Sequence, residues 1–200
     1  MKRRAVFLDR DGTLNRERGF VRSPDELEVL PGVSEALERL RAAGFLPVVL
    51  TNQSGIARGL YSEVDLAQVH AELDARTGHR IAAYFHCPHH PEAIGHPYGG
   101  ECTCRKPRRG LLAQAVEVLG LSLPDSWLVG DSARDLLPAR GLPLRTVLVQ
   151  SGKPWEPEVA RLRAEAAEPT CVVADLAAAA AAITGAPSAT SSPCAPPSGT

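Results

Sequence analysis

The chain has 200 residues, 44% hydrophobic and 22% charged, which is ordinary globular usage and excludes a wholly disordered or fibrous protein. Its 22 Lys and Arg residues nearly balance 23 Asp and Glu residues, so the net charge of -1 provides no global basic field for nucleic acid. No apolar run reaches the roughly 18 residues that cross a bilayer, and the apolar stretch near the start is too short for a secretory signal. We therefore expect a cytoplasmic protein with neither a nucleic-acid nor a membrane partner.

Short apolar runs alternate with segments of helical periodicity along most of the chain. The apolar runs predict buried strands, and the periodic segments predict the helices that connect parallel strands. This alternation predicts an α/β fold, a Rossmann-like parallel sheet flanked by helices. In chain order we expect a strand at 5–8, a helix at 32–43, strands at 45–50 and 81–85 around a helix at 62–77, a helix at 108–119, a strand at 127–129, a helix at 133–140, a strand at 145–149, a helix at 157–168, a strand at 171–174 and a helix at 175–183.

Two segments depart from this alternation. Residues 86–107 are rich in Pro, His and Gly and have little periodicity, so they predict a long loop that needs a reason to be ordered. Residues 185–200 consist of Pro, Ser, Ala, Thr and Gly with one Cys, which is typical of a disordered tail. We expect one domain over 1–184 followed by this tail.

Polar side chains follow three of the predicted strands. Asp9 and Asp11 follow the first strand, Thr51 and Asn52 follow the second, and Asp131 follows the fourth. Ligands bind beyond the carboxyl ends of the strands in open parallel sheets, so these residues are candidates for one site. Three carboxylates there would repel one another unless a cation such as Mg²⁺ neutralised them. Each Asp alone could equally cap a helix or occupy a turn, but their joint occurrence at strand ends favours a site.

A phosphate group would complete such a site. The Thr51 hydroxyl, the backbone amides of 52–56 and Lys106 are suitable donors. A loop lysine without context is most often solvated. Lys106 lies between the Cys- and His-rich loop and a predicted helix, which favours the functional interpretation.

Four parts of the sequence carry this candidate chemistry: DRDGTLN at 9–15, TNQSG at 51–55, Lys106, and GDS at 130–132 with Asp135. In sequence and order they resemble the four motifs of the haloacid dehalogenase superfamily of phosphohydrolases. The resemblance implies a Mg²⁺-dependent phosphatase in which Asp9 attacks phosphorus to form an aspartyl phosphate. It also implies that Asp11 protonates the leaving oxygen and later activates water, while Thr51 and Lys106 stabilise the phosphoryl group. Asp9 and Asp131 would bind Mg²⁺ through their side chains, and Asp11 through its backbone carbonyl.

The loop at 86–107 contains a second group of candidate ligands. Cys87 and His89 form one close pair, Cys102 and Cys104 form another, and 12 residues separate the pairs. A closed Cys₃His set suits structural Zn²⁺, which would order the loop. Three further histidines compete as ligands: His86, His90 and His96. We favour His89 because Cys-x-His mirrors Cys-x-Cys, and three unrelated free thiols are the alternative.

The sequence of this loop resembles one particular branch of the superfamily. CPHHP at 87–91 and CTCRKP at 102–107 are similar to the zinc-containing, capless branch of the superfamily, which includes heptose bisphosphate and histidinol-phosphate phosphatases. The resemblance implies removal of the 7-phosphate of D-glycero-D-manno-heptose 1,7-bisphosphate by a protein without a large cap domain. Histidinol phosphate, or a broad range of small phosphate monoesters, is the alternative substrate class.

The same resemblance implies a set of substrate contacts. Arg105 would hold a second phosphate bidentately, and its alternative is a surface arginine that packs its stem. We expect a monomer whose partner is a small phosphorylated sugar. The implied substrate-binding residues are Glu17, Arg18, Gly19, Phe20, Asn52, Gln53, Ser54, Arg105 and Ser132.

Two other function classes fit the sequence less well. A zinc-stabilised binding module would not need both a nucleophile and a proton donor, which Asp9 and Asp11 supply. A nucleic-acid end phosphatase could use the basic residues at 105–109, but no aromatic residues are interleaved with them to stack on bases.

Overall fold

The computed structural model describes residues 3–185 of the 200-residue chain. The predicted disordered tail, apart from residue 185, lies outside the described residues. The strands are β1 (Arg4–Leu8), β2 (Phe45–Asn52), β3 (Ala83–Cys87), β4 (Trp127–Gly130), β5 (Arg145–Val149) and β6 (Cys171–Val173). The helices are α1 (Val33–Ala42), α2 (Glu63–Arg76), α3 (Gly110–Leu119), α4 (Ala133–Leu136), α5 (Trp155–Ala164) and α6 (Leu176–Thr184), with short 3-10 helices η1 (Pro24–Glu26) and η2 (Leu137–Ala139).

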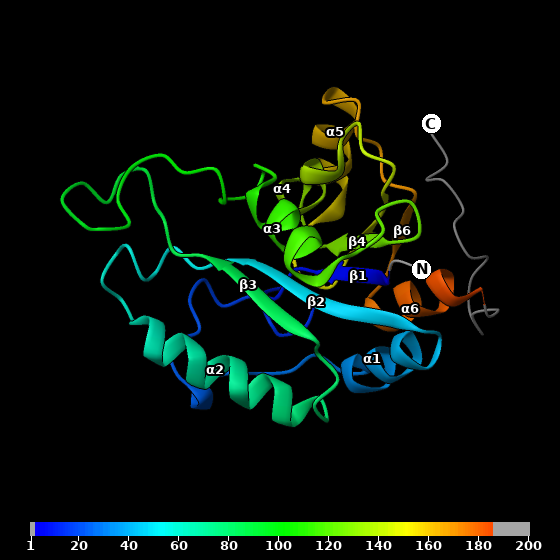
Figure 1. Cartoon of the computed structure of the whole chain (residues 1–200), viewed down its shortest axis with the longest axis horizontal. Coiled ribbons are helices and arrows are strands. Elements are labelled where there is room, and N and C mark those ends of the chain that lie inside the picture. The colour runs from blue at the N-terminus through cyan, green and yellow to red at the C-terminus, as the bar shows by residue number, and fades with distance from the viewer. Residues whose placement is uncertain (1–2, 186–200) are drawn as a thin grey trace.

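The six strands form one parallel sheet in the order β3-β2-β1-β4-β5-β6. The chain first builds one half of the sheet outward from β1 and then crosses to build the other half outward from β4 (Figure 1). This is the strand order of a doubly wound, Rossmann-like sheet. The predicted α/β architecture is confirmed.

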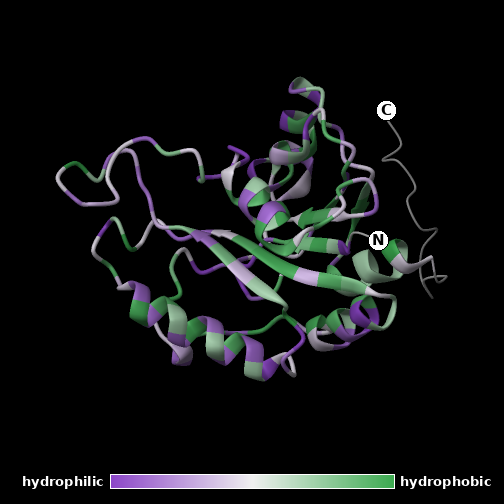
Figure 2. Cartoon of the chain, viewed as in Figure 1, coloured by the Kyte–Doolittle hydropathy of each residue, from purple (hydrophilic) through white to green (hydrophobic). Residues whose placement is uncertain are grey.

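Helices cover both faces of the sheet, so the central strands are buried on both sides. In β1, Val6 and Leu8 contribute to one core with α1, α2 and α6, while Ala5 and Phe7 contribute to the other with α3, α4 and α5. This follows from the two-residue period of a strand. Figure 2 shows the apolar strands between helices with mixed polar and apolar surfaces. Within residues 3–185, no helix combines the length and the apolar character that crossing a membrane requires.

The predicted elements differ from the observed ones mainly at their ends. Strand β3 begins and ends two residues later than predicted, and the segment expected as one helix at 133–140 divides into α4 and η2. The helix η1 was not predicted. The two longest connections, 9–32 and 88–109, contain only η1 and isolated bridges, so the part of the chain from 3 to 185 has no separate cap domain, as expected.

Candidate active site

The candidate site lies at the carboxyl ends of the two central strands. Asp9 follows β1 and Asp131 follows β4, and these strands are hydrogen-bonded neighbours. The connection after β1 leads toward β2 on one side, whereas the connection after β4 leads toward β5 on the other. Where the connections diverge in this way, a doubly wound sheet forms its ligand-binding crevice.

Three buried carboxylates meet at this point. Asp9, Asp131 and Asp135 are each at most 5% exposed, and one oxygen from each lies within 4.8 Å of the others. Burial, followed by repulsion from Asp135, raises the pKa of Asp9 to about 6 and that of Asp131 to about 8. The cluster therefore favours a cation among its oxygens.

Lys106 supplies one positive charge to this cluster. Its Nζ lies 2.6 Å from Asp9 Oδ1 and 2.8 Å from Asp135 Oδ1, and it donates to the Leu50 carbonyl at 2.7 Å. Burial opposes its charge, but Asp135 and Asp9 raise the pKa of Lys106 above its usual value. Asn52 fixes the Lys106 backbone by accepting its N–H at 3.0 Å and donating to its carbonyl at 3.1 Å. Asn52, predicted as a substrate contact, thus positions the lysine.

The space beside Asp131 fits a divalent cation. A Cβ atom at Gly12 would lie 2.3 Å from Asp131 Oδ2, and one at Gly152 would lie 1.9 Å from it, so both glycines keep this space open. The Nζ of Lys153 lies 3.2 Å from the same oxygen. Carboxylate and backbone carbonyl oxygens are the ligands that hard divalent cations prefer. The carboxylates of Asp9, Asp131 and Asp135 provide oxygen atoms for such a donor set.

The side chain of Asp11 is held by three neighbours. Arg10 Nη2 donates to Asp11 Oδ1 at 3.0 Å, Asn15 Nδ2 donates to the same oxygen at 2.9 Å, and Gln53 Nε2 donates to Oδ2 at 3.1 Å. Burial would raise the pKa of Asp11, but the Arg10 charge and these hydrogen bonds hold it below its usual value. The carboxylate is therefore ionised and oriented before any ligand arrives.

Gln53 links Asp11 to Thr51. Its Nε2 also donates to Thr51 Oγ1 at 2.8 Å, and its Oε1 accepts the Tyr61 hydroxyl at 2.6 Å. Because Thr51 Oγ1 accepts from Gln53, its own proton is free to be donated to a ligand. The amide of Gln53, a predicted substrate contact, thus orients Thr51 and Asp11.

The loop after β1 brings only part of its predicted residues toward the acidic cluster. Glu17 Oε2 lies 3.7 Å from Lys153 Nζ, which itself contacts the cluster. Phe20 packs against a small apolar cluster formed by the loop after β2 and the start of α2. Arg18 instead pairs with Glu28, and both side chains are exposed. Of these residues, Glu17 is coupled to the site through Lys153.

The remaining predicted contacts have different surroundings. Ser132 is buried and donates its hydroxyl to Asp135. Ser54 is half-buried at the start of the turn after β2, and Gly19 occupies a left-handed position with φ of 79°. Arg105 is half-buried and donates to a backbone carbonyl of the 88–109 connection at 3.2 Å. Ser132 is thus a positioning residue for Asp135.

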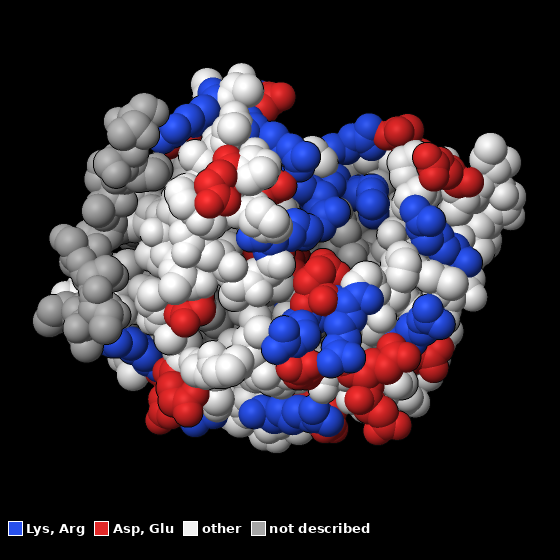
Figure 3. Space-filling model, turned by 180° about the vertical axis from the view of Figure 1, so that it is seen from behind, with Lys and Arg blue, Asp and Glu red and all other residues white. Residues whose placement is uncertain are grey.

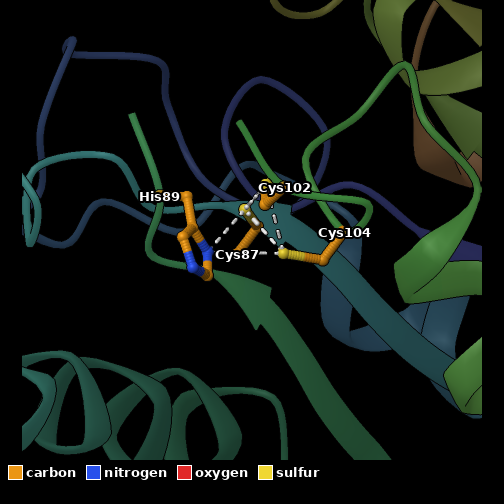
Figure 4. Close-up of side chains that lie close together, drawn as sticks. All are labelled: Cys87, His89, Cys102 and Cys104. Carbon is orange, nitrogen blue, oxygen red and sulfur yellow. Dashed lines mark hydrogen bonds between the residues drawn. The ribbon is translucent and has the colours of Figure 1, made fainter. Parts of the chain in front are cut away.

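A second cluster lies where β3 meets the 88–109 connection. The sulfur atoms of Cys87, Cys102 and Cys104 are 3.1 to 3.6 Å apart. His89 Nδ1 lies 3.8 Å from Cys87 Sγ and 3.5 Å from Cys104 Sγ (Figure 4). A tetrahedral metal with bonds of about 2.3 Å would space its sulfur ligands by roughly 3.8 Å. These four side chains therefore could hold one metal ion.

The competing histidines lie outside this cluster. Each has another polar neighbour, which supports the choice of His89 as the fourth ligand. The neighbouring pairs are His86 with Glu63, His90 with Arg58, and His96 with the backbone N–H of Tyr98.

The structure adds cations that the sequence prediction omitted. Lys153 contacts Asp131, and Arg134 Nε lies 3.9 Å from Asp135 Oδ1. Lys153 lies in the connection after β5, so the strand-end rule that identified Asp9 would also have identified it. Arg134 also follows a strand end, that of β4, but it lies on a short helix, where an arginine is usually solvated.

Comparison with known proteins agrees with this geometry. A family model described as HAD-hydrolase-like matches residues 103–179. D-glycero-beta-D-manno-heptose-1,7-bisphosphate 7-phosphatase of Pasteurella multocida (strain Pm70) is 44% identical over 156 residues, which cover 76% of this chain and 84% of that protein. The protein of the same name from Escherichia coli (strain K12) is 39% identical over 158 residues, covering 77% and 83% respectively.

Solved structures give the same result. The crystal structure of D,D-heptose 1,7-bisphosphate phosphatase from B. bronchiseptica, complexed with magnesium and phosphate, has a TM-score of 0.72 and 34% identity, covering 88% of this chain and 96% of that one. The corresponding phosphatase from Burkholderia thailandensis has a TM-score of 0.57 and 32% identity, covering 89% and 96%. The chain belongs to the D-glycero-beta-D-manno-heptose-1,7-bisphosphate 7-phosphatase family of HAD-like hydrolases.

Proposed function

We propose that this protein removes the 7-phosphate of D-glycero-D-manno-heptose 1,7-bisphosphate by a Mg²⁺-dependent reaction through an aspartyl phosphate. The observation that carries the proposal is the buried contact between Asp9 and Lys106 at the crevice between β1 and β4. The names of relatives that are 39 to 44% identical over most of the chain support the substrate.

The first step is attack on phosphorus by a carboxylate oxygen of Asp9. A phosphorus–oxygen bond forms to Asp9 as the bond to the sugar oxygen breaks. Lys106 and the Thr51 hydroxyl donate to the phosphoryl oxygens, where negative charge must be balanced. In the second step water attacks the same phosphorus, which releases inorganic phosphate and restores the Asp9 carboxylate.

Asp11 handles the proton in both steps. It gives a proton to the departing sugar oxygen and later takes one from the attacking water. The first role requires a protonated carboxyl, although Arg10 holds the pKa of Asp11 low in the free protein. An anionic phosphate beside Asp11 would raise this pKa by like-charge repulsion, so we propose that substrate binding itself prepares the acid.

Two metal ions have separate parts in the proposal. Mg²⁺ would be held by Asp9, Asp131 and the Asp11 carbonyl and would supply charge neutralisation. The proposed metal of the four-residue cluster at Cys87 is Zn²⁺ with a structural role, because four protein ligands leave no position for water. We further propose a cytoplasmic location, where the three cysteines of this cluster would stay reduced and able to bind the metal.

Histidinol phosphate, or small phosphate monoesters in general, remains the second substrate class. The residues that perform phosphoryl transfer are shared by both classes, so they do not decide between them. The relatives' names favour the heptose.

We further propose that the protein is a monomer. Few large apolar side chains are exposed on residues 3–185, namely Leu60, Val64, Ile94 and Val118.

The nucleophile can be tested by Asp9→Asn. The amide cannot form the aspartyl phosphate, so we expect phosphate release to fall by about 10⁴-fold or more with the thermal unfolding temperature nearly retained. Asp25→Asn, at an exposed position in η1, is the matched control and should retain the wild-type rate. A folded Asp9→Asn variant with a wild-type rate would exclude Asp9 as the nucleophile.

A further inference from the structure

Arg134 is a cation beside the active site whose donors are unused. Its Nε lies 3.9 Å from Asp135, and among the described residues 3–185 its guanidinium donates no hydrogen bond. Burial opposes its charge, but Asp135, Asp9, Asp131 and Glu17, in that order, raise the pKa of Arg134 above its usual value. The side chain therefore lies within the field of the whole acidic cluster, while 44% of its surface remains exposed to an incoming ligand.

A second arginine, Arg105, comes from a different part of the chain. It lines a neighbouring cavity, and Pro107 lines both that cavity and the one beside Arg134. Two guanidinium groups that repel each other at the edge of a site gain stability when an anion lies between them. A phosphate group has the charge and the acceptor oxygens for this position.

A cavity of about 480 Å³ adjoins Arg134 and provides the space. Lys153, which contacts Asp131, and Pro107, which follows the catalytic lysine, line the same cavity, so it is continuous with the site. Figure 3 shows one face of the molecule on which Lys and Arg side chains gather around a hollow.

The acidic side chains that line this cavity are already paired. Glu158 accepts the backbone N–H of Ala133 at 2.7 Å and pairs with Arg161 at 2.9 Å. Glu165 pairs with Arg140. Arg161 is thereby neutralised, whereas Arg134 keeps its donors for a ligand.

We propose that Arg134 binds the non-reacting phosphate of the bisphosphate substrate from the side opposite Arg105. The inference rests on the proposed function and deepens it, because it names the group that distinguishes a bisphosphate from a monophosphate. The two arginines come from α4 and from the 88–109 connection. Side chains attached to both halves of the sheet would therefore contact the second phosphate.

The test compares heptose 1,7-bisphosphate with heptose 7-phosphate, which carry the same reacting group. For Arg134→Gln we expect kcat/KM to fall about 10- to 100-fold more for the bisphosphate than for the monophosphate, the loss expected for a charged hydrogen bond. Arg134→Lys should recover part of this difference. Arg161→Gln, in the same cavity but paired with Glu158, is the matched control and should leave the ratio unchanged.

A binding measurement separates substrate recognition from turnover. In the Asp9→Asn background, calorimetry with Mg²⁺ present should show that Arg134→Gln raises Kd for the bisphosphate by a similar factor. Equal losses for both substrates, or a wild-type protein with no preference for the bisphosphate, would overturn the subsite while leaving the phosphatase intact. Absence of turnover of either substrate by the wild type would instead overturn the proposed function and the subsite with it.

Discussion

His70 is a buried histidine next to a buried arginine. Its Nε2 lies 3.4 Å from Arg10 Nη1, its ring stacks on Tyr84 with centroids 4.4 Å apart, and it is 8% exposed. Burial, followed by the Arg10 charge, lowers the pKa of His70 to about 3. The ring is neutral in the folded protein, where it packs beside the arginine that orients Asp11.

This histidine makes stability depend on pH. Between pH 6.5 and about 3 the unfolded chain binds a proton at His70 and the folded protein does not, so the free energy of unfolding falls as pH falls. Within this window we expect the His70→Gln variant to lose up to about 1.4 kcal/mol less per pH unit than the wild type. Urea unfolding at pH 6.5, 5.5 and 4.5 measures the slope. Equal slopes for both proteins would contradict the neutral histidine.

Residue by residue, the sequence identified the groups at strand ends but not their partners. Asp9 and Asp131 were predictable because a buried strand stops at each of them. That Asn52 holds Lys106 was not predictable, because the contact joins residues 54 positions apart. The role proposed for Arg134 was not predictable for the same reason, because it depends on Arg105, which lines a neighbouring cavity and comes from another loop.

At the scale of elements, the 88–109 connection depends on few apolar contacts. It has one isolated bridge, between His90 and Gly99, and several of its residues are exposed. The cluster of Cys87, His89, Cys102 and Cys104 ties its two ends together next to β3. Because Arg105 and Lys106 directly follow this cluster, ordering of the loop also positions the two side chains that we propose bind phosphate.

Substitution of one cysteine of the cluster should show whether the bound metal orders the 88–109 connection. We expect Cys102→Ser to reduce bound zinc from about one ion per chain to nearly none and to lower the Tm by roughly 5–15 °C, with activity falling as the loop loosens. Elemental analysis and thermal denaturation measure the two effects. Thr103→Ser, at the exposed position between the two cysteines, should retain both zinc and stability. Unchanged zinc content in Cys102→Ser would contradict the assigned ligand set.

Every strand but β3 begins within one residue of its predicted start, whereas β3 is shifted by two residues at both ends. Four of its five residues are half-buried, so the apolar pattern that marks a strand is weak at this edge of the sheet. Its register is set by pairing with β2, from Val48 opposite Ala83 to Asn52 opposite Cys87. This pairing places Cys87 at the strand end, which local sequence alone does not determine.

For the molecule as a whole, the strand order assembles the site. Lys106 and Asp9 are 97 residues apart in sequence, and they meet because β1 lies between β2 and β4. The alternation of elements predicted a parallel sheet but not which strands are neighbours, since that depends on long-range packing. The four motifs supplied this information through the family they resemble.

The most direct test of the account is the initial rate of phosphate release from heptose 1,7-bisphosphate, with and without Mg²⁺, beside histidinol phosphate and simple sugar phosphates. We expect a Mg²⁺-dependent preference for the heptose bisphosphate, because the acidic cluster needs a cation and Arg105 and Arg134 favour a second phosphate. Preference for histidinol phosphate, or release that does not depend on Mg²⁺, would contradict it.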